Sequence, residues 1–133
     1  MINETHLNNM KYFKLSEFDS PDEVGSGSNM DATFLEMLDD ARGWAGIPFK
    51  ITSGFRTPSH NAYVGGVLPN PDKGIKGSSH MYGYAADIAC NNSSDREIIL
   101  NALIEAGFRR IGIAKTFIHV DNDPDKNPSV WLY

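Results

Sequence analysis

Apolar residues recur along this chain at two spacings, which predict helices in some segments and strands in others. Between positions 32 and 45 they fall three or four residues apart, as on one face of a helix: Phe34, Leu38, Ala41 and Ala45. Asp31 precedes this segment as an N-cap residue, and Gly46 follows it as an exit residue. We therefore predict a helix over about 32–45.

A second helical pattern covers about 95–106, with Ser94 and Glu97 placed as a capping box. The shorter apolar segments alternate or are β-branched, and they predict strands over 49–53, 85–90, 110–114 and 116–121. Helices and strands are mixed without regular βαβ alternation. We therefore predict an α+β fold with a small, mostly antiparallel sheet flanked by helices.

Three segments lack a regular pattern. Residues 54–86 are rich in Gly, Pro and polar side chains, and long loops of this kind inside a domain are usually functional. We predict that residues 1–30 form an irregular arm, which packs on the domain through four apolar anchors: Tyr12, Phe13, Leu15 and Phe18. We predict residues 122–133 to be a loop that includes a solvated turn at Asp123, Asp125 and Lys126.

Composition excludes several classes of protein. The chain has 133 residues, of which 41% are hydrophobic and 22% charged, so we expect one globular domain over 1–133 and a monomer. A net charge of −5 and a pI near 5.2 argue against a nucleic-acid binder. No apolar run is long enough to span a membrane. The first residues do not resemble a secretory signal, so we expect synthesis in the cytoplasm.

Histidine and carboxylate are the metal ligands this chain can offer, because its single cysteine excludes a Cys-rich zinc module. His80 shortly precedes a predicted strand that contains Asp87, and His119 lies within another. Two histidines and one carboxylate leave one position of a tetrahedral zinc for water, whose pKa then falls towards about 7. Alternatively, these histidines are hydrogen-bonded structural residues and Asp87 caps a strand. We assign the other two histidines to that structural class: His6 and His60.

Three segments carry a specific combination of residues: Ser53-Gly54-Phe55-Arg56-Thr57-Pro58, Ser78-x-His80-x-x-Gly83-x-Ala85-x-Asp87 and Phe117-Ile118-His119-Val120-Asp121. Over almost the whole chain, this combination resembles the zinc D-alanyl-D-alanine carboxypeptidase family. That family includes bacterial cell-wall peptidases and phage endolysins, and its fold is shared with the hedgehog signalling domain. The resemblance implies one Zn²⁺ ion held by His80, Asp87 and His119.

The resemblance also implies that Arg56 lies beside the metal and receives a substrate carboxylate or carbonyl oxygen. A guanidinium suits this role because it makes charge-assisted, bidentate contacts with carboxylates; the alternative is a surface salt bridge. We expect Ser78 to orient a ligand or to bind a substrate amide. Tyr82 flanks the site, where it either stacks on the substrate or holds its own loop in place, and we assign it to substrate binding.

One position departs from the family pattern. Some relatives have an acidic general base three residues before the last histidine ligand, and here that residue is Thr116. The nearest carboxylate is Asp121, two residues after His119 and therefore on the same strand face. Asp121 is either the base or a partner that orients a ligand histidine.

The resemblance predicts a zinc metallopeptidase that hydrolyses the peptide stem of bacterial peptidoglycan, at D-alanyl-D-alanine or at L-alanyl-D-glutamate. The expected place of action is the cell wall, as a phage lysis or virion-associated protein. The alternative is a non-catalytic binding domain stabilised by zinc on the same scaffold, which the missing acid at Thr116 supports.

Overall fold

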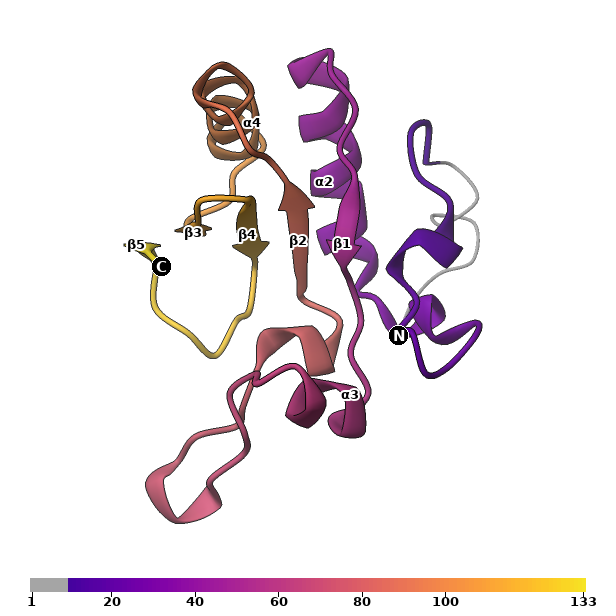
Figure 1. The fold of residues 1–133 in the computed structure, drawn as a ribbon, viewed down its shortest axis with the longest axis vertical. Helices are drawn as coiled ribbons and strands as arrows, with labels where there is room; N and C mark the ends of the chain where they lie inside the picture. Colours follow the sequence, from indigo (N-terminus) through magenta and orange to yellow (C-terminus); the bar gives the residue numbers. More distant parts are fainter. Residues whose placement is uncertain (1–9) are drawn as a thin grey trace.

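A computed structural model describes residues 10–133 of the chain, and Figure 1 shows its fold. Two long helices, α2 (Ala32–Ala45) and α4 (Ser93–Glu105), contact each other and pack on one face of a five-stranded sheet. The predicted α+β class is therefore confirmed. None of the helices within residues 10–133 is both long and apolar enough to cross a bilayer.

The strands are ordered β1-β2-β4-β3-β5 across the sheet. Neighbouring strands are antiparallel except for β3 and β5, which are parallel. The strand bounds are Ile51–Ser53 for β1, Ala85–Ala89 for β2, Arg110–Ile113 for β3, Phe117–Asp121 for β4 and Ser129–Leu132 for β5.

Alternation along each strand separates a core face from a second face, which we call the site face. In β4, Ile118 and Val120 are fully buried in the core, whereas His119 and Asp121 lie on the site face. The helices complete the core with fully buried apolar side chains, among them Phe34, Leu38, Ile99 and Leu103.

The strand register places four residues in one row across the site face. Asp87 in β2 lies opposite His119 in β4, His119 lies opposite Gly112 in β3, and Gly112 lies opposite Trp131 in β5. A Cβ atom on Gly112 would lie 2.5 Å from Nε1 of Trp131, so glycine leaves room for the indole ring. Residues 44 positions apart in sequence thus share one row.

The segment between β1 and β2 supplies the remaining wall of the site. It contains α3 (Pro58–Tyr63), which Thr57 caps and Pro58 starts, and two short 3-10 helices at Pro71–Lys73 and Ser79–Tyr82. In Figure 1 it extends below the sheet, beyond the lower end of β2.

The described part of the N-terminal arm packs on the domain. Phe13 and Phe18 are buried in the core, and Leu15 packs against it. Tyr12 is 45% exposed, but its ring also lies against α2, beside Gly43 and 4.5 Å from the guanidinium of Arg42. The histidine at position 6 lies outside the described residues.

Two further predictions need correction. The tail was predicted as a loop, but Ser129–Leu132 forms β5, because the open edge of β3 offers it hydrogen-bond partners. Helix α4 begins at Ser93 rather than near Asp95, because Asn92 is its N-cap and accepts a hydrogen bond from the Asp95 amide at 2.8 Å. The N-cap Asp31 and the exit residue Gly46 of α2 are confirmed.

Gly83 joins the arm to the turn that carries His80, which gives a stability prediction. Its φ is +79°, and an added Cβ would lie 2.2 Å from the carbonyl oxygen of Asn29 in the arm. Gly74 has a φ of +68° but open space around it. Alanine at either position incurs a backbone cost of about 1–2 kcal/mol, and only Gly83→Ala adds a clash.

We predict that Gly83→Ala lowers the free energy of unfolding by about 2 kcal/mol more than Gly74→Ala in urea denaturation. Equal losses would contradict the close packing of the arm on this turn.

Candidate metal centre

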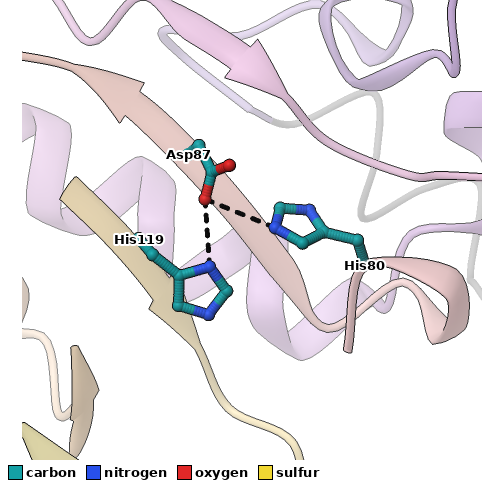
Figure 2. Close-up of side chains that lie close together, drawn as sticks. All are labelled: His80, Asp87 and His119. Atoms are coloured by element: carbon teal, nitrogen blue, oxygen red, sulfur yellow. Dashed lines mark hydrogen bonds and ion pairs between the residues drawn. The ribbon is translucent and has the colours of Figure 1, made fainter. Parts of the chain in front are cut away.

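Three predicted ligands from separate elements meet on the site face: His80, Asp87 and His119 (Figure 2). Oδ1 of Asp87 lies 3.0 Å from Nδ1 of His119 and 3.3 Å from Nε2 of His80. All three residues are buried, and their donor atoms lie within 4.8 Å of one another. Within residues 10–133, this is the one group of three or more His, Cys, Asp or Glu side chains close enough to share an ion.

The turn before β2 fixes the orientation of His80. Ser78 is the N-cap of the short 3-10 helix, and its hydroxyl accepts a hydrogen bond from the His80 amide. Nδ1 of His80 lies 2.8 Å from the carbonyl oxygen of Gly54. A carbonyl can only accept, so Nδ1 carries the proton and Nε2 faces Asp87. Burial lowers the pKa of His80, which favours this neutral form.

Two carboxylates hold His119 from both sides. Nε2 of His119 lies 2.7 Å from Oδ2 of Asp121, and Nδ1 faces Asp87. Burial alone would lower the pKa of His119, but the hydrogen bonds to Asp121 and Asp87 raise it. In the metal-free protein this favours the imidazolium, which donates to both carboxylates.

Asp121 is itself held by three hydrogen bonds. Its Oδ2 accepts from His119, and its Oδ1 accepts from Nε of Arg110 at 2.7 Å and from the Asp123 amide at 3.2 Å. Burial would raise the pKa of Asp121, but His119 and Arg110 lower it. A carboxylate that accepts from the far nitrogen of a ligand histidine fixes the ring tautomer and orientation. The geometry therefore favours the orienting role predicted for Asp121 over the base role.

The donor chemistry of the cluster fits a divalent cation. When Nδ1 of His80 donates to Gly54 and Nε2 of His119 donates to Asp121, the two remaining ring nitrogens present lone pairs to Asp87. Three acceptors then converge, and a cation is what satisfies them. Burial would raise the pKa of Asp87, yet its contact with His119 holds it well below the usual range, so Asp87 stays anionic. Two imidazoles and one carboxylate suit zinc.

Comparison with known families agrees with this donor set. The sequence model of the Peptidase M15 family matches residues 11–121, which include all three donors. The chain belongs to the Peptidase M15 family. Members of this family are metallopeptidases, typically with zinc, so the predicted resemblance is confirmed. A search of curated proteins finds no match to the chain.

The candidate metal centre of this M15 family member lies in a cleft of about 440 Å³, within the size range of ligand sites. Besides the three donors, the side chains that line this cleft include Arg56, Ser78, Arg110, Lys126, Trp131 and Tyr133. The structure thus brings the predicted Arg56 and Ser78 together with the donors.

Arg56 is anchored beside Asp87. Its Nε donates to Oγ of Ser53 at 2.9 Å, and its two terminal nitrogens lie 3.3 Å from Oδ1 of Asn61 and 3.4 Å from Oδ2 of Asp87. Burial lowers the pKa of Arg56, and Asp87 opposes this shift. These contacts use three of the five N–H groups of the guanidinium, and Arg56 also lines the cleft.

Tyr82 is not among the residues that line the cleft. Its hydroxyl donates to the carbonyl oxygen of Lys76 at 2.8 Å, and the Lys76 ammonium lies 4.7 Å from its ring centre. These contacts match the alternative in which the tyrosine holds its own loop in place. Its predicted role in substrate binding stays a prediction.

The predicted solvated turn at 123–126 is wrong for two of its three residues. Asp123 is 2% exposed, because Lys76 binds its Oδ1 at 2.6 Å and Ser79 donates to its Oδ2 at 2.7 Å. Burial would raise the pKa of Asp123, but these partners lower it. Lys126 lines the cleft, whereas Asp125 is exposed as predicted.

Sequence reasoning also missed Arg110, Trp131 and Tyr133. Arg110 lies opposite Asp121 in the β3–β4 register, and the alternation of β3 offered a signal for it. Trp131 lies 5.4 Å from the ring of His119, and Tyr133 lies 5.1 Å from the ring of Phe117. Together these rings form an aromatic rim along one side of the cleft.

If Asp121 orients His119, removing its charge must weaken metal binding. We predict that Asp121→Asn lowers zinc affinity about 10- to 100-fold, because the amide holds the ring tautomer less firmly. Competition with a chromophoric chelator measures this affinity. The exposed Asp72 provides the control, and Asp72→Asn should bind zinc like the wild type. Unchanged affinity in Asp121→Asn would rule out the orienting role.

Proposed function

We propose that this protein is a zinc metallopeptidase that hydrolyses the peptide stem of bacterial peptidoglycan. The observation that carries the proposal is the convergence of His80, Asp87 and His119 in a cleft that also contains Arg56, in a chain of the Peptidase M15 family. Two stem bonds fit the proposal, namely the terminal D-alanyl-D-alanine bond and the L-alanyl-D-glutamate bond.

Zinc, when bound here, would supply Lewis acidity for the scissile carbonyl and a water of lowered pKa. The three donors would hold it: His80 through Nε2, His119 through Nδ1 and Asp87 through Oδ1. Because one tetrahedral position is left without a protein ligand, the site has the composition of a catalytic centre rather than a closed structural one.

Arg56 is assigned to the substrate oxygen beside the metal. Its contacts with Ser53, Asn61 and Asp87 hold the guanidinium plane in place, and the residue lines the cleft. A preorganised cation at this position stabilises negative charge as it develops on the carbonyl oxygen. Ser78 assists indirectly by fixing the turn that carries His80.

Asp121 is assigned to positioning, because each of its oxygens already accepts a hydrogen bond inside the protein. Thr116, where some relatives have an acid, is exposed at the start of β4. Its uncharged side chain cannot act as a general base.

A non-catalytic zinc-stabilised binding domain is the second candidate, and the neutral residue at Thr116 is the observation that favours it. The open coordination position and the adjacent cleft support an enzyme instead. For the place of action we propose the bacterial cell wall, with the protein a monomer supplied as a phage lysis or virion-associated component. The resemblance of the sequence motifs to a family that includes cell-wall peptidases and phage endolysins motivates this part of the proposal.

The experiment that tests the proposal incubates the zinc-loaded protein with purified peptidoglycan and identifies released fragments by mass spectrometry. We predict cleavage at one of the two stem bonds and loss of cleavage after chelation. If the protein retains intact muropeptides without cutting them, it is a binding domain, and the proposed peptidase activity is wrong.

A matched pair of arginine variants completes this test. Arg56→Gln should keep zinc but lower kcat/KM about 10²- to 10³-fold, the usual effect of removing a group that stabilises the developing oxyanion. Arg109→Gln, on an exposed residue next to β3, should retain both zinc and activity. Equal activity in the two variants would exclude the assigned role of Arg56.

A further inference from the structure

The ammonium of Lys126 is held rigidly at the edge of the cleft. Its Nζ donates to Oγ of Ser79 at 2.8 Å and to the carbonyl oxygen of Gly77 at 3.0 Å. An ammonium has three N–H donors. Among the described residues, no third acceptor lies within hydrogen-bond distance, since the nearest carboxylate oxygen is Oδ2 of Asp123 at 3.7 Å. One donor is therefore left over on a side chain that lines the cleft.

Asp123 does not neutralise Lys126 effectively, because other groups already bind it. Lys76 lies 2.6 Å from its Oδ1, and the Asp125 amide donates to the same oxygen at 3.0 Å. The Ser79 hydroxyl donates to its Oδ2 at 2.7 Å. The side chain of Lys126 is 29% exposed, and burial lowers its pKa. Its charge is thus partly desolvated and faces a carboxylate 3.7 Å away that is shared with Lys76, so it would gain from an incoming anion.

The cleft as a whole favours an anionic ligand. Its charged lining residues are three cations and two carboxylates: Arg56, Arg110, Lys126, Asp87 and Asp121. This positive excess lies in a protein whose net charge is −5. Arg110 is bound to Asp121, and Arg56 lies beside Asp87. Lys126 is therefore the cleft cation whose nearest carboxylate oxygen lies farthest away, at 3.7 Å and on a carboxylate that Lys76 also binds.

We propose that Lys126 is the anchor for a substrate carboxylate, and that Arg56 serves the scissile carbonyl. The ligand class is a peptide with a free carboxylate next to the bond that is cut. Two sources supply this group: the carboxyl terminus of an acyl-D-alanyl-D-alanine, or the α-carboxylate of D-glutamate after L-alanine. Lys126 lies beyond residues 11–121, the span matched by the family model. The anchor therefore depends on this chain's own C-terminal segment, and the inference rests on the proposed function.

Paired substrates test the anchor. Each pair contains a free carboxylate in one member and a carboxamide in the other: acyl-D-alanyl-D-alanine with its terminal amide, and muramyl-L-alanyl-D-glutamate with its D-isoglutamine form. In the pair that is cleaved, the wild type should prefer the carboxylate about 10- to 100-fold in kcat/KM. Lys126→Met should abolish this preference, mainly through KM, and Lys126→Arg should restore much of it.

The controls separate recognition from a structural effect. Lys126→Met also removes the contacts with Gly77 and Ser79, but a shifted loop would lower activity on both members of a pair equally. Lys115→Met, on an exposed lysine in the turn between β3 and β4, should keep the wild-type preference. A preference that survives in Lys126→Met would overturn the anchor.

Failure of the proposed function gives a different result. If the wild type cleaves neither pair, the peptidoglycan peptidase assignment fails. Calorimetric titration of the same peptides into the zinc-loaded protein then decides whether Lys126 binds a carboxylate. Carboxylate-selective binding that is lost in Lys126→Met supports it. Equal binding of carboxylate and carboxamide by the wild type overturns it.

Discussion

Asp87 and His119 lie directly opposite each other in neighbouring antiparallel strands, and the rest of the site depends on this pairing. A shift of one residue between β2 and β4 would turn one of them towards the core, because strand side chains alternate with a period of two. The core face holds the register, since Ile88, Ile118 and Val120 are fully buried there. The same strands therefore build the core and set the distance between two candidate metal ligands.

The buried polar groups of the site compensate one another in a chain of contacts. His119 lies between Asp87 and Asp121, and Asp121 lies between His119 and Arg110. Hydrogen bonds to charged groups contribute about 1.5–3 kcal/mol each, whereas removing one partner of a buried ion pair costs about 3–5 kcal/mol. Each of these four side chains is thus bound to the next, which keeps the ring of His119 in one orientation.

Local sequence patterns predicted the elements whose signals are local. The caps at Asp31 and Gly46 bound α2 as expected, and apolar periodicity found β2 and β4. The three ligands were predicted because a resemblance to a known family joined segments that periodicity alone could not bring together. The geometry then confirmed that they meet.

Features that depend on distant contacts were not predictable in the same way. Strand β5 exists because β3, more than a dozen residues earlier, offers an edge to pair with in parallel. Lys126 resembles a solvated turn residue in the sequence, yet it bonds Ser79, which lies 47 positions away. Such burial follows from the packing of the long 54–84 segment against the turn after β4, and no local pattern encodes it.

X-ray absorption spectroscopy of the zinc-loaded protein tests the central claim most directly. We expect one zinc per chain, bound by two imidazole nitrogens and by oxygen at about 2.0–2.1 Å. Outer-shell scattering should correspond to two imidazole rings. A sulfur ligand at about 2.3 Å, or a spectrum without imidazole scattering, would contradict a metal centre built from His80, Asp87 and His119.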